Sequence, residues 1–171
     1  MLVMEYATNG DLHNYLQKNF TNITWFRKVE ILLQISKGYL YFEFIFYFRL
    51  ENIHKEDFIH RDLHSGNILL DKKNILTGSD YYHCKIGDLG LSQPASNTSS
   101  NNEIYGVIPY IAPEIFNGSA FSKESDVYCM GMIMWELTTG CKPFANVKHD
   151  IHLVYKILDG ERPKITEDTP K

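Results

Sequence analysis

His60-Arg61-Asp62-Leu63-His64-Ser65-Gly66-Asn67 is a charged segment that separates two short apolar pieces, Phe58-Ile59 and Ile68-Leu69-Leu70. The apolar pieces predict small strands, so the charged residues should lie in a loop held between them. A third apolar piece, Cys84-Lys85-Ile86, predicts another strand, and Asp88-Leu89-Gly90 follows it. Each motif alone is weak evidence, because Asp-Xaa-Gly is also a common turn. Their order within one short region makes them informative together.

Two further motifs lie toward the C-terminus, Ala112-Pro113-Glu114 and Asp126-Val127-Tyr128-Cys129-Met130-Gly131. Residues 126–139 are apolar on nearly every side, which predicts a helix in the core that ends at Gly140. Asp126 could cap the start of this helix. A last helix should begin after Asp150.

Helix caps also organise the N-terminal part of the chain. Residues 1–6 predict a short buried strand, and Asp11 should cap the helix that follows. Thr24 should cap a second helix that runs to about Gly38. The inward face of this second helix is predicted from apolar residues at helical spacing, which are Trp25, Val29, Leu32 and Leu33.

Composition sets broad limits on the function. The chain has 171 residues, 44% of them hydrophobic and 22% charged, which is enough for one buried core. A formal net charge of -4 provides no basic surface for nucleic acid or anionic lipid, so neither partner is expected. No apolar run reaches the length of a membrane-spanning helix. Three scattered cysteines fit a reducing compartment, and we expect a cytoplasmic protein.

In their order and intervals, these motifs resemble those of a eukaryotic protein kinase. His60-Arg61-Asp62 and Asp88-Leu89-Gly90 are similar to its catalytic and metal-binding motifs, and Ala112-Pro113-Glu114 is similar to the end of its activation segment. Leu2-Val3-Met4-Glu5-Tyr6 is similar to the hinge. The resemblance covers nearly all of residues 1–168 and is closest to the tyrosine-kinase-like group, which mostly phosphorylates serine and threonine.

The resemblance implies an α+β fold, namely the mainly helical C-terminal lobe of the bilobal kinase fold with the N-lobe absent. Residues 1–171 would form a partial kinase domain. The sequence holds no Gly-rich phosphate loop, strand lysine or helix glutamate of an N-lobe. It also ends before the helices whose arginine pairs with the residue at the Glu114 position, so we expect a buried carboxylate without its partner there.

Residue roles follow from the same resemblance. Asp62 would be the catalytic carboxylate that receives the acceptor hydroxyl, and Asn67 and Asp88 would bind Mg²⁺. For ATP, the resemblance makes Met4 the gatekeeper, the Glu5 carbonyl and Ala7 N–H the adenine partners, Asp11 a ribose contact and Leu69 the floor beneath the ring. The implied activity is transfer of the γ-phosphoryl group to a protein substrate in intracellular signalling.

Two departures from the family leave alternatives open. His64 and Val107 stand where serine/threonine kinases usually have lysine and threonine, so a tyrosine acceptor is also considered. An inactive, pseudokinase-like interaction module is the alternative to an enzyme. The resemblance further implies that Arg61 receives a phosphate on the activation segment, where the candidate sites are Ser96, Thr98, Ser99, Ser100 and Tyr105. The sequence does not predict the oligomeric state.

Three segments do not follow the family pattern. Residues 39–49 form an aromatic-rich insertion, for which we consider an unspliced intron, a gene-model error or a genuine segment that packs on a partner. Residues 72–83 should form a protruding turn. Residues 92–102 are rich in serine, threonine and asparagine, and we expect a mobile loop there.

Overall fold

The computed structural model describes residues 7–36, 49–74, 80–96 and 103–166. The helices and strands, in chain order, are α1 (Leu12–Asn19), α2 (Trp25–Ser36), α3 (Leu50–Lys55), β1 (Phe58–Ile59), β2 (Ile68–Asn74), β3 (Asp80–Ile86), β4 (Gln93–Pro94), α4 (Pro113–Phe116), α5 (Lys123–Thr139) and α6 (Ile151–Leu158). Short 3-10 turns lie at Phe20–Asn22, Ser65–Asn67, Leu89–Leu91 and Ile108–Tyr110. The predicted strand at residues 1–6 lies outside the described residues, as does the predicted insertion at residues 39–49 except for Arg49.

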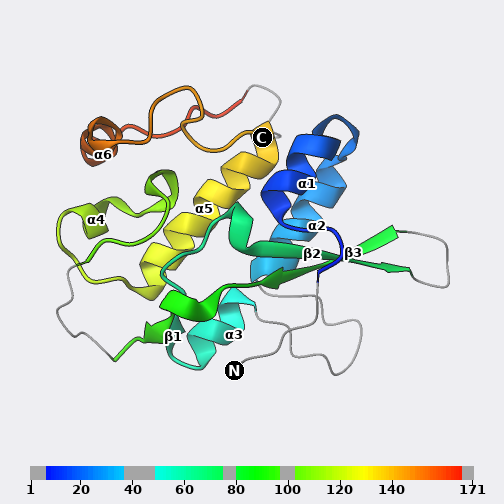
Figure 1. The fold of residues 1–171 in the computed structure, drawn as a ribbon, viewed down its shortest axis with the longest axis horizontal. Helices are drawn as coiled ribbons and strands as arrows, with labels where there is room; N and C mark the ends of the chain where they lie inside the picture. The colour runs from blue at the N-terminus through cyan, green and yellow to red at the C-terminus, as the bar shows by residue number, and fades with distance from the viewer. Residues whose placement is uncertain (1–6, 37–48, 75–79, 97–102, 167–171) are drawn as a thin grey trace.

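Helix α5 runs through the middle of the molecule, with α1 and α2 on one side and α4 and α6 on the other (Figure 1). The described strands form two small antiparallel sheets. One pairs β1 with β4, and the other pairs β2 with β3 from Ile68 opposite Ile86 to Asn74 opposite Asp80. The loop between β1 and β2 therefore lies at the centre, where both sheets meet α5.

The segments predicted as a turn and as a mobile loop are partly regular structure. Strand β2 extends to Asn74 and β3 begins at Asp80, so much of the predicted turn at residues 72–83 is paired backbone. The first part of residues 92–102 also pairs, because Gln93–Pro94 forms β4 against β1. Gln93 and Pro94 are therefore paired backbone rather than loop, and the mobility of the segment stays a prediction.

The helix caps predicted at Asp11, Thr24 and Asp150 are confirmed. The Asp11 carboxylate accepts the backbone N–H of Asn14 at 2.9 Å, and the Thr24 hydroxyl accepts that of Arg27 at 3.3 Å. Asp150 accepts the N–H of His152 at 3.0 Å at the start of α6. These side chains satisfy backbone donors that have no partner in the first helical turn, so each helix begins where its cap stands.

The predicted inward face of α2 is wrong by part of a turn. Val29 and Leu33 are 48% and 38% exposed, whereas Ile31 and Ile35 are buried. The buried side also contains Gln34, whose Oε1 accepts the Cys84 N–H of β3 at 2.9 Å. A neighbouring strand thus selects the face of α2. The Gln34 oxygen is hydrogen-bonded there, whereas its buried Nε2 has no partner among the described residues.

Helix α5 begins earlier than predicted and is not buried all round. Ser122 is its N-cap and forms a capping box with Ser125, so Asp126 lies inside the first turn. Val127 and Met134 are 60% and 51% exposed on the outer side. The helix ends as predicted at Gly140, whose φ of 73° is left-handed. The inner stripe holds two fully buried carboxylates in addition to its apolar residues, and both belong to the site described next.

The core joins α1, α2, α5 and the β2–β3 sheet. Its fully buried apolar side chains include Leu12, Leu16, Ile31, Ile35, Ile68, Ile133 and Leu137. No helix among the described residues has the length and apolar character needed to cross a bilayer.

Candidate active site

Asp126 of α5 ties down the charged loop between β1 and β2. The Asp126 carboxylate is fully buried and accepts the backbone N–H groups of His60 at 2.8 Å and Arg61 at 3.0 Å. His54 of α3 donates its Nε2–H to the same carboxylate at 2.9 Å. Since Arg61 has a left-handed φ of 73°, these bonds hold the loop in a strained shape. Asp126 thus anchors the loop, while Ser122 caps α5.

His60 links this loop to the strand that precedes Asp88. The Asp62 N–H donates to His60 Nδ1 at 3.3 Å, which leaves the ring proton on Nε2. His60 Nε2–H donates to the Gly87 carbonyl at 3.0 Å. The buried ring thus fixes the loop relative to residues 87–88, and sequence spacing alone gave no sign of this contact.

Asp62 has Asn67 and His64 as neighbours but keeps part of its carboxylate accessible, with 18% of the side chain exposed. Asn67 Nδ2 donates to the Asp62 carbonyl at 2.8 Å and lies 3.4 Å from its Oδ2. His64 Nε2 lies 3.8 Å from Oδ1. On the remaining side, a Cβ added to Gly106 would come within 3.1 Å of Oδ1. Only a residue without a side chain leaves this approach to the carboxylate open.

Asn67 and Asp88, the predicted metal ligands, lie on neighbouring backbone segments. The Gly87 N–H donates to the Asn67 carbonyl at 2.8 Å, just after the pair Ile68 and Ile86 closes the sheet. Asp88 is exposed, with a left-handed φ of 55°, and accepts the Gly90 N–H at 3.3 Å. The donor set suits magnesium, because the Asn67 side chain has its Nδ2 engaged and its Oδ1 without a partner among the described residues, while Asp88 supplies an anionic oxygen.

No group of three or more His, Cys, Asp or Glu suited to a metal occurs in the part of the chain that the structure describes.

The predicted nucleotide contacts Ala7, Asp11 and Leu69 converge beside β2. Asn9 N–H donates to the Leu70 carbonyl and Leu70 N–H donates to the Gly10 carbonyl, at 3.0 and 2.8 Å. Asp11 and Leu69 form an isolated bridge. Met4 and Glu5, the other two predicted contacts, lie outside the described residues. The roles of all five in nucleotide binding stay predictions.

Glu136 and Tyr110 belong to a buried polar network that the sequence did not reveal. Glu136 is fully buried and accepts His13 Nδ1–H at 2.7 Å and the Tyr110 hydroxyl at 2.5 Å. Burial, followed by the Glu136 carboxylate, raises the pKa of Tyr110 well above its usual range. Ser65 donates to the Tyr110 oxygen at 3.2 Å. A glutamate in an apolar helix was the available signal, since such a group needs buried partners.

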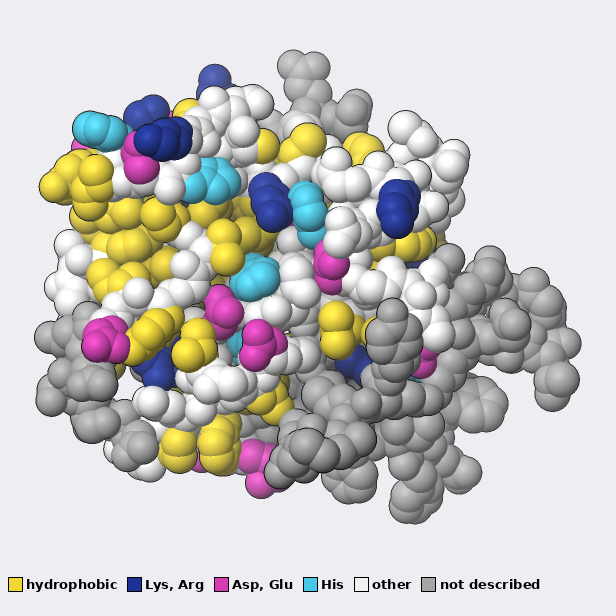
Figure 2. Space-filling model, in the orientation of Figure 1, with side chains coloured by type: hydrophobic (Ala, Val, Ile, Leu, Met, Phe, Trp, Pro, Cys, Tyr) yellow, Lys and Arg dark blue, Asp and Glu magenta, His cyan; other side chains and the backbone are white. Residues whose placement is uncertain are grey.

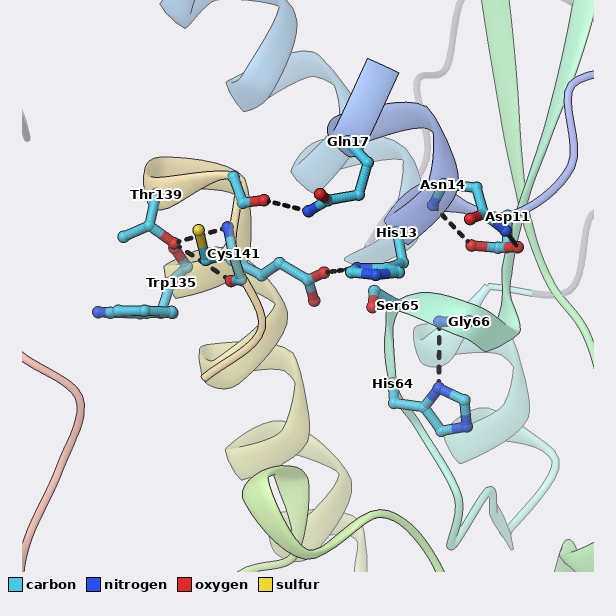
Figure 3. A network of polar contacts seen from close by, with 12 residues as sticks. Asp11, His13, Asn14, Gln17, His64, Ser65, Gly66, Trp135, Thr139 and Cys141 are labelled. Carbon is cyan, nitrogen blue, oxygen red and sulfur yellow. Dashed lines mark hydrogen bonds and ion pairs between the residues drawn. The ribbon is translucent and has the colours of Figure 1, made fainter. Parts of the chain in front are cut away.

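His64 faces both Asp62 and this network. The Gly66 N–H donates to His64 Nδ1 at 3.0 Å, so the neutral ring carries its proton on Nε2 (Figure 3). The ring lies 5.9 Å from that of Tyr110. Burial lowers the pKa of His64, against the opposing effect of the Asp62 carboxylate. A neutral imidazole thus stands where the family usually has a lysine.

Arg61 already has partners in this structure. Its guanidinium carbon lies 4.9 Å from the ring centre of Phe121 and 5.6 Å from that of Tyr105, and Nη1 donates to the Leu91 carbonyl at 3.4 Å. Ser96 is exposed, while residues 98–100 lie outside the described part. Glu114 is exposed, so the expectation of a buried unpaired carboxylate there is wrong.

Comparison with known proteins gives consistent matches. A family model described as protein tyrosine and serine/threonine kinase matches residues 1–171. Stress-activated protein kinase alpha of Dictyostelium discoideum is 32% identical over 99% of this chain and 26% of its own length. Dual specificity protein kinase zakA of the same organism is 33% identical over 99% of this chain and 21% of its own. Serine/threonine-protein kinase VIK of Arabidopsis thaliana is 34% identical, with coverages of 95% and 34%. The chain thus spans about a third or less of each relative.

Proposed function

The chain belongs to the protein tyrosine and serine/threonine kinase family, and from that premise we propose that it carries the phosphoryl-transfer site of an ATP- and Mg²⁺-dependent protein kinase. The proposal rests on how close Asp62, Asn67 and Asp88 lie to one another. Asn67 donates to the Asp62 carbonyl, and Gly87, the residue before Asp88, donates to the Asn67 carbonyl. One carboxylate and two oxygen ligands in this arrangement suit transfer between a metal-bound phosphate and a hydroxyl.

Each residue contributes one part of the proposed reaction. The accessible carboxylate of Asp62 orients the acceptor hydroxyl and takes its proton, a role that contributes about 10²–10⁴-fold in rate. Asn67 holds Asp62 by its amide nitrogen and presents its carbonyl oxygen to the metal, together with Asp88. Bound Mg²⁺ supplies charge neutralisation at the phosphates. His60 and Asp126 keep these groups in place, which matters because misplacement by about 1 Å can cost about 10²-fold.

The same proposal includes the kinase lobe to which the chain belongs, the amino acid that accepts the phosphoryl group and the location of the protein in the cell. The mainly helical described part, with small sheets beside the site, supports assignment to the C-terminal lobe. Serine or threonine is the proposed acceptor, and tyrosine is kept as the second possibility because one relative is named a dual specificity kinase. Free cysteines at positions 84, 129 and 141 support a cytoplasmic location. The low net charge supports a protein substrate rather than nucleic acid or membrane.

The test is phosphate transfer from radiolabelled ATP to a generic protein acceptor, with the purified chain and two matched variants. Asp62→Asn removes the proton acceptor, and transfer should fall by at least about 10²-fold. Asp159→Asn makes the same chemical change at an exposed position and should keep the wild-type rate. Equal rates for the chain and both variants, or no transfer by any of them, would favour the alternative, an inactive interaction module.

A further inference from the structure

A cavity of about 210 Å³ lies beside Asp62, between α1, the loop at residues 64–66 and the loop that follows α5, and most of its lining residues have polar side chains. Asn67, Leu69 and Asp88 do not line it, whereas Asp11, the predicted ribose contact, does, so the cavity adjoins the proposed nucleotide side and is separate from the proposed metal ligands. The volume is below the roughly 300 Å³ at which small-molecule pockets begin, and it suits a single side chain. Its lining residues are Asp11, His13, Asn14, His64, Ser65, Gly66, Val107, Tyr110 and Lys142.

Two histidine rings and one lysine, from three separate segments, meet at this cavity, and the His64 ring among them is neutral. His13 comes from α1, His64 from the central loop and Lys142 from the loop after α5. Figure 3 shows the rings of His13 and His64 on either side of Ser65. Lys142 is exposed and forms no ion pair with any residue that the structure describes. On the face seen in Figure 2, basic and histidine side chains lie side by side in the upper half.

The carboxylates near the cavity are already engaged. Asp11 accepts two bonds from Asn14, at 2.9 Å from the backbone nitrogen and 2.6 Å from Nδ2, and so caps α1. Glu136 lies behind the wall, fully buried, and accepts from His13 and Tyr110. An incoming arginine would compete with these bonds and meet Lys142, whereas an anion would meet the Lys142 ammonium, which forms no ion pair with the described residues.

We propose that this cavity binds an acidic side chain, a carboxylate or a phosphate, of the acceptor protein. The inference rests on the proposed function, which places the acceptor hydroxyl at Asp62. His64 lines the cavity and its Nε2 lies 3.8 Å from Asp62 Oδ1, so the two subsites adjoin. An extended peptide advances about 3.3 Å per residue, which places the acidic residue within about three positions of the acceptor hydroxyl.

Binding is tested without catalysis by fluorescence anisotropy of short labelled peptides. The four peptides have a central serine and, at a neighbouring position, aspartate, phosphoserine, alanine or arginine. Each position within three residues of the serine is tried. The aspartate or the phosphoserine peptide should bind at least tenfold more tightly than the alanine peptide, and their relative affinities distinguish a carboxylate from a phosphate site.

A matched pair of charge-reversal variants tests whether Lys142 causes the preference for acidic peptides. Lys142→Glu should abolish the preference for acidic peptides, while Lys148→Glu should keep it, because Lys148 is 87% exposed and does not line the cavity. Both positions are exposed, so both variants should fold. Tighter binding of the arginine peptide, no discrimination, no binding at all, or equal effects of the two reversals would overturn the proposal. Because Asp62→Asn should retain the preference, a failed transfer assay counts against the proposed function alone.

Discussion

The anchor made by Asp126 gives a prediction with a calculable size. Asp126→Ala leaves the buried N–H groups of His60 and Arg61 without an acceptor. Each unsatisfied buried donor costs about 1–3 kcal/mol, so the variant should lose about 4 kcal/mol of unfolding free energy. Domains of this size have roughly 5–15 kcal/mol in total, so the variant should be folded but much weaker.

The assay combines urea unfolding with amide hydrogen exchange at His60 and Arg61. Both amides should lose protection in Asp126→Ala, because the loop would open before the rest of the molecule. Val127→Ala is the control on the same helix turn, where a 60% exposed side chain should change stability by no more than about 0.5 kcal/mol. A loss below about 1 kcal/mol with both amides still protected would refute this account of the loop.

Three further predictions concern other parts of the chain. Gly140→Ala should destabilise the chain by about 1–3 kcal/mol in urea unfolding, because φ is 73° and the new Cβ would lie 2.6 Å from the Phe20 ring. Gly131→Ala is the control and should be neutral or stabilising, since nothing lies within 4 Å of its Cβ. Equal effects of the two substitutions on stability would contradict this prediction. Burial lowers the pKa of His64, so the unfolded chain binds its proton at higher pH than the folded chain, and stability should fall as pH drops below about 6.5. His64→Gln should flatten this part of the pH profile of unfolding, and an unchanged slope would count against it. Iodoacetamide should label exposed Cys141 well before Cys84, because burial raises the pKa of Cys84 to about 12. Mass spectrometry of the two cysteine peptides measures the labelling rates. Equal rates would contradict this prediction.

Local signals predicted the starts of α1, α2 and α6, and tertiary contacts decided which faces are buried. Asp11, Thr24 and Asp150 act on donors two or three residues away, so a short window of sequence contains the whole interaction. The face of α2 depends instead on Cys84 of β3, which binds Gln34 from 50 residues away. A periodicity of apolar residues holds no information about such a neighbour.

The candidate site divides in the same way. Motif resemblance was enough to select Asp62, Asn67 and Asp88 as residues that lie near one another, although their chemical roles stay proposals. It was not enough for His13 and Glu136, which are 123 residues apart and carry no motif. Their pairing follows from the packing of α1 against α5, and only a three-dimensional structure shows it.

The contacts between α1 and the end of α5 also bear on the order in which the chain folds. Gln17 donates to the Gly140 carbonyl and His13 binds Glu136, both across 123 residues. At about 5–20 residues per second, the ribosome makes the second partner roughly 6–25 s after the first. Contacts of this range also carry the largest loop-closure entropy. The side of the cavity that His13 and Lys142 line should therefore be among the last parts of the molecule to form. The β2–β3 hairpin should form well before it, because its paired residues are close in sequence.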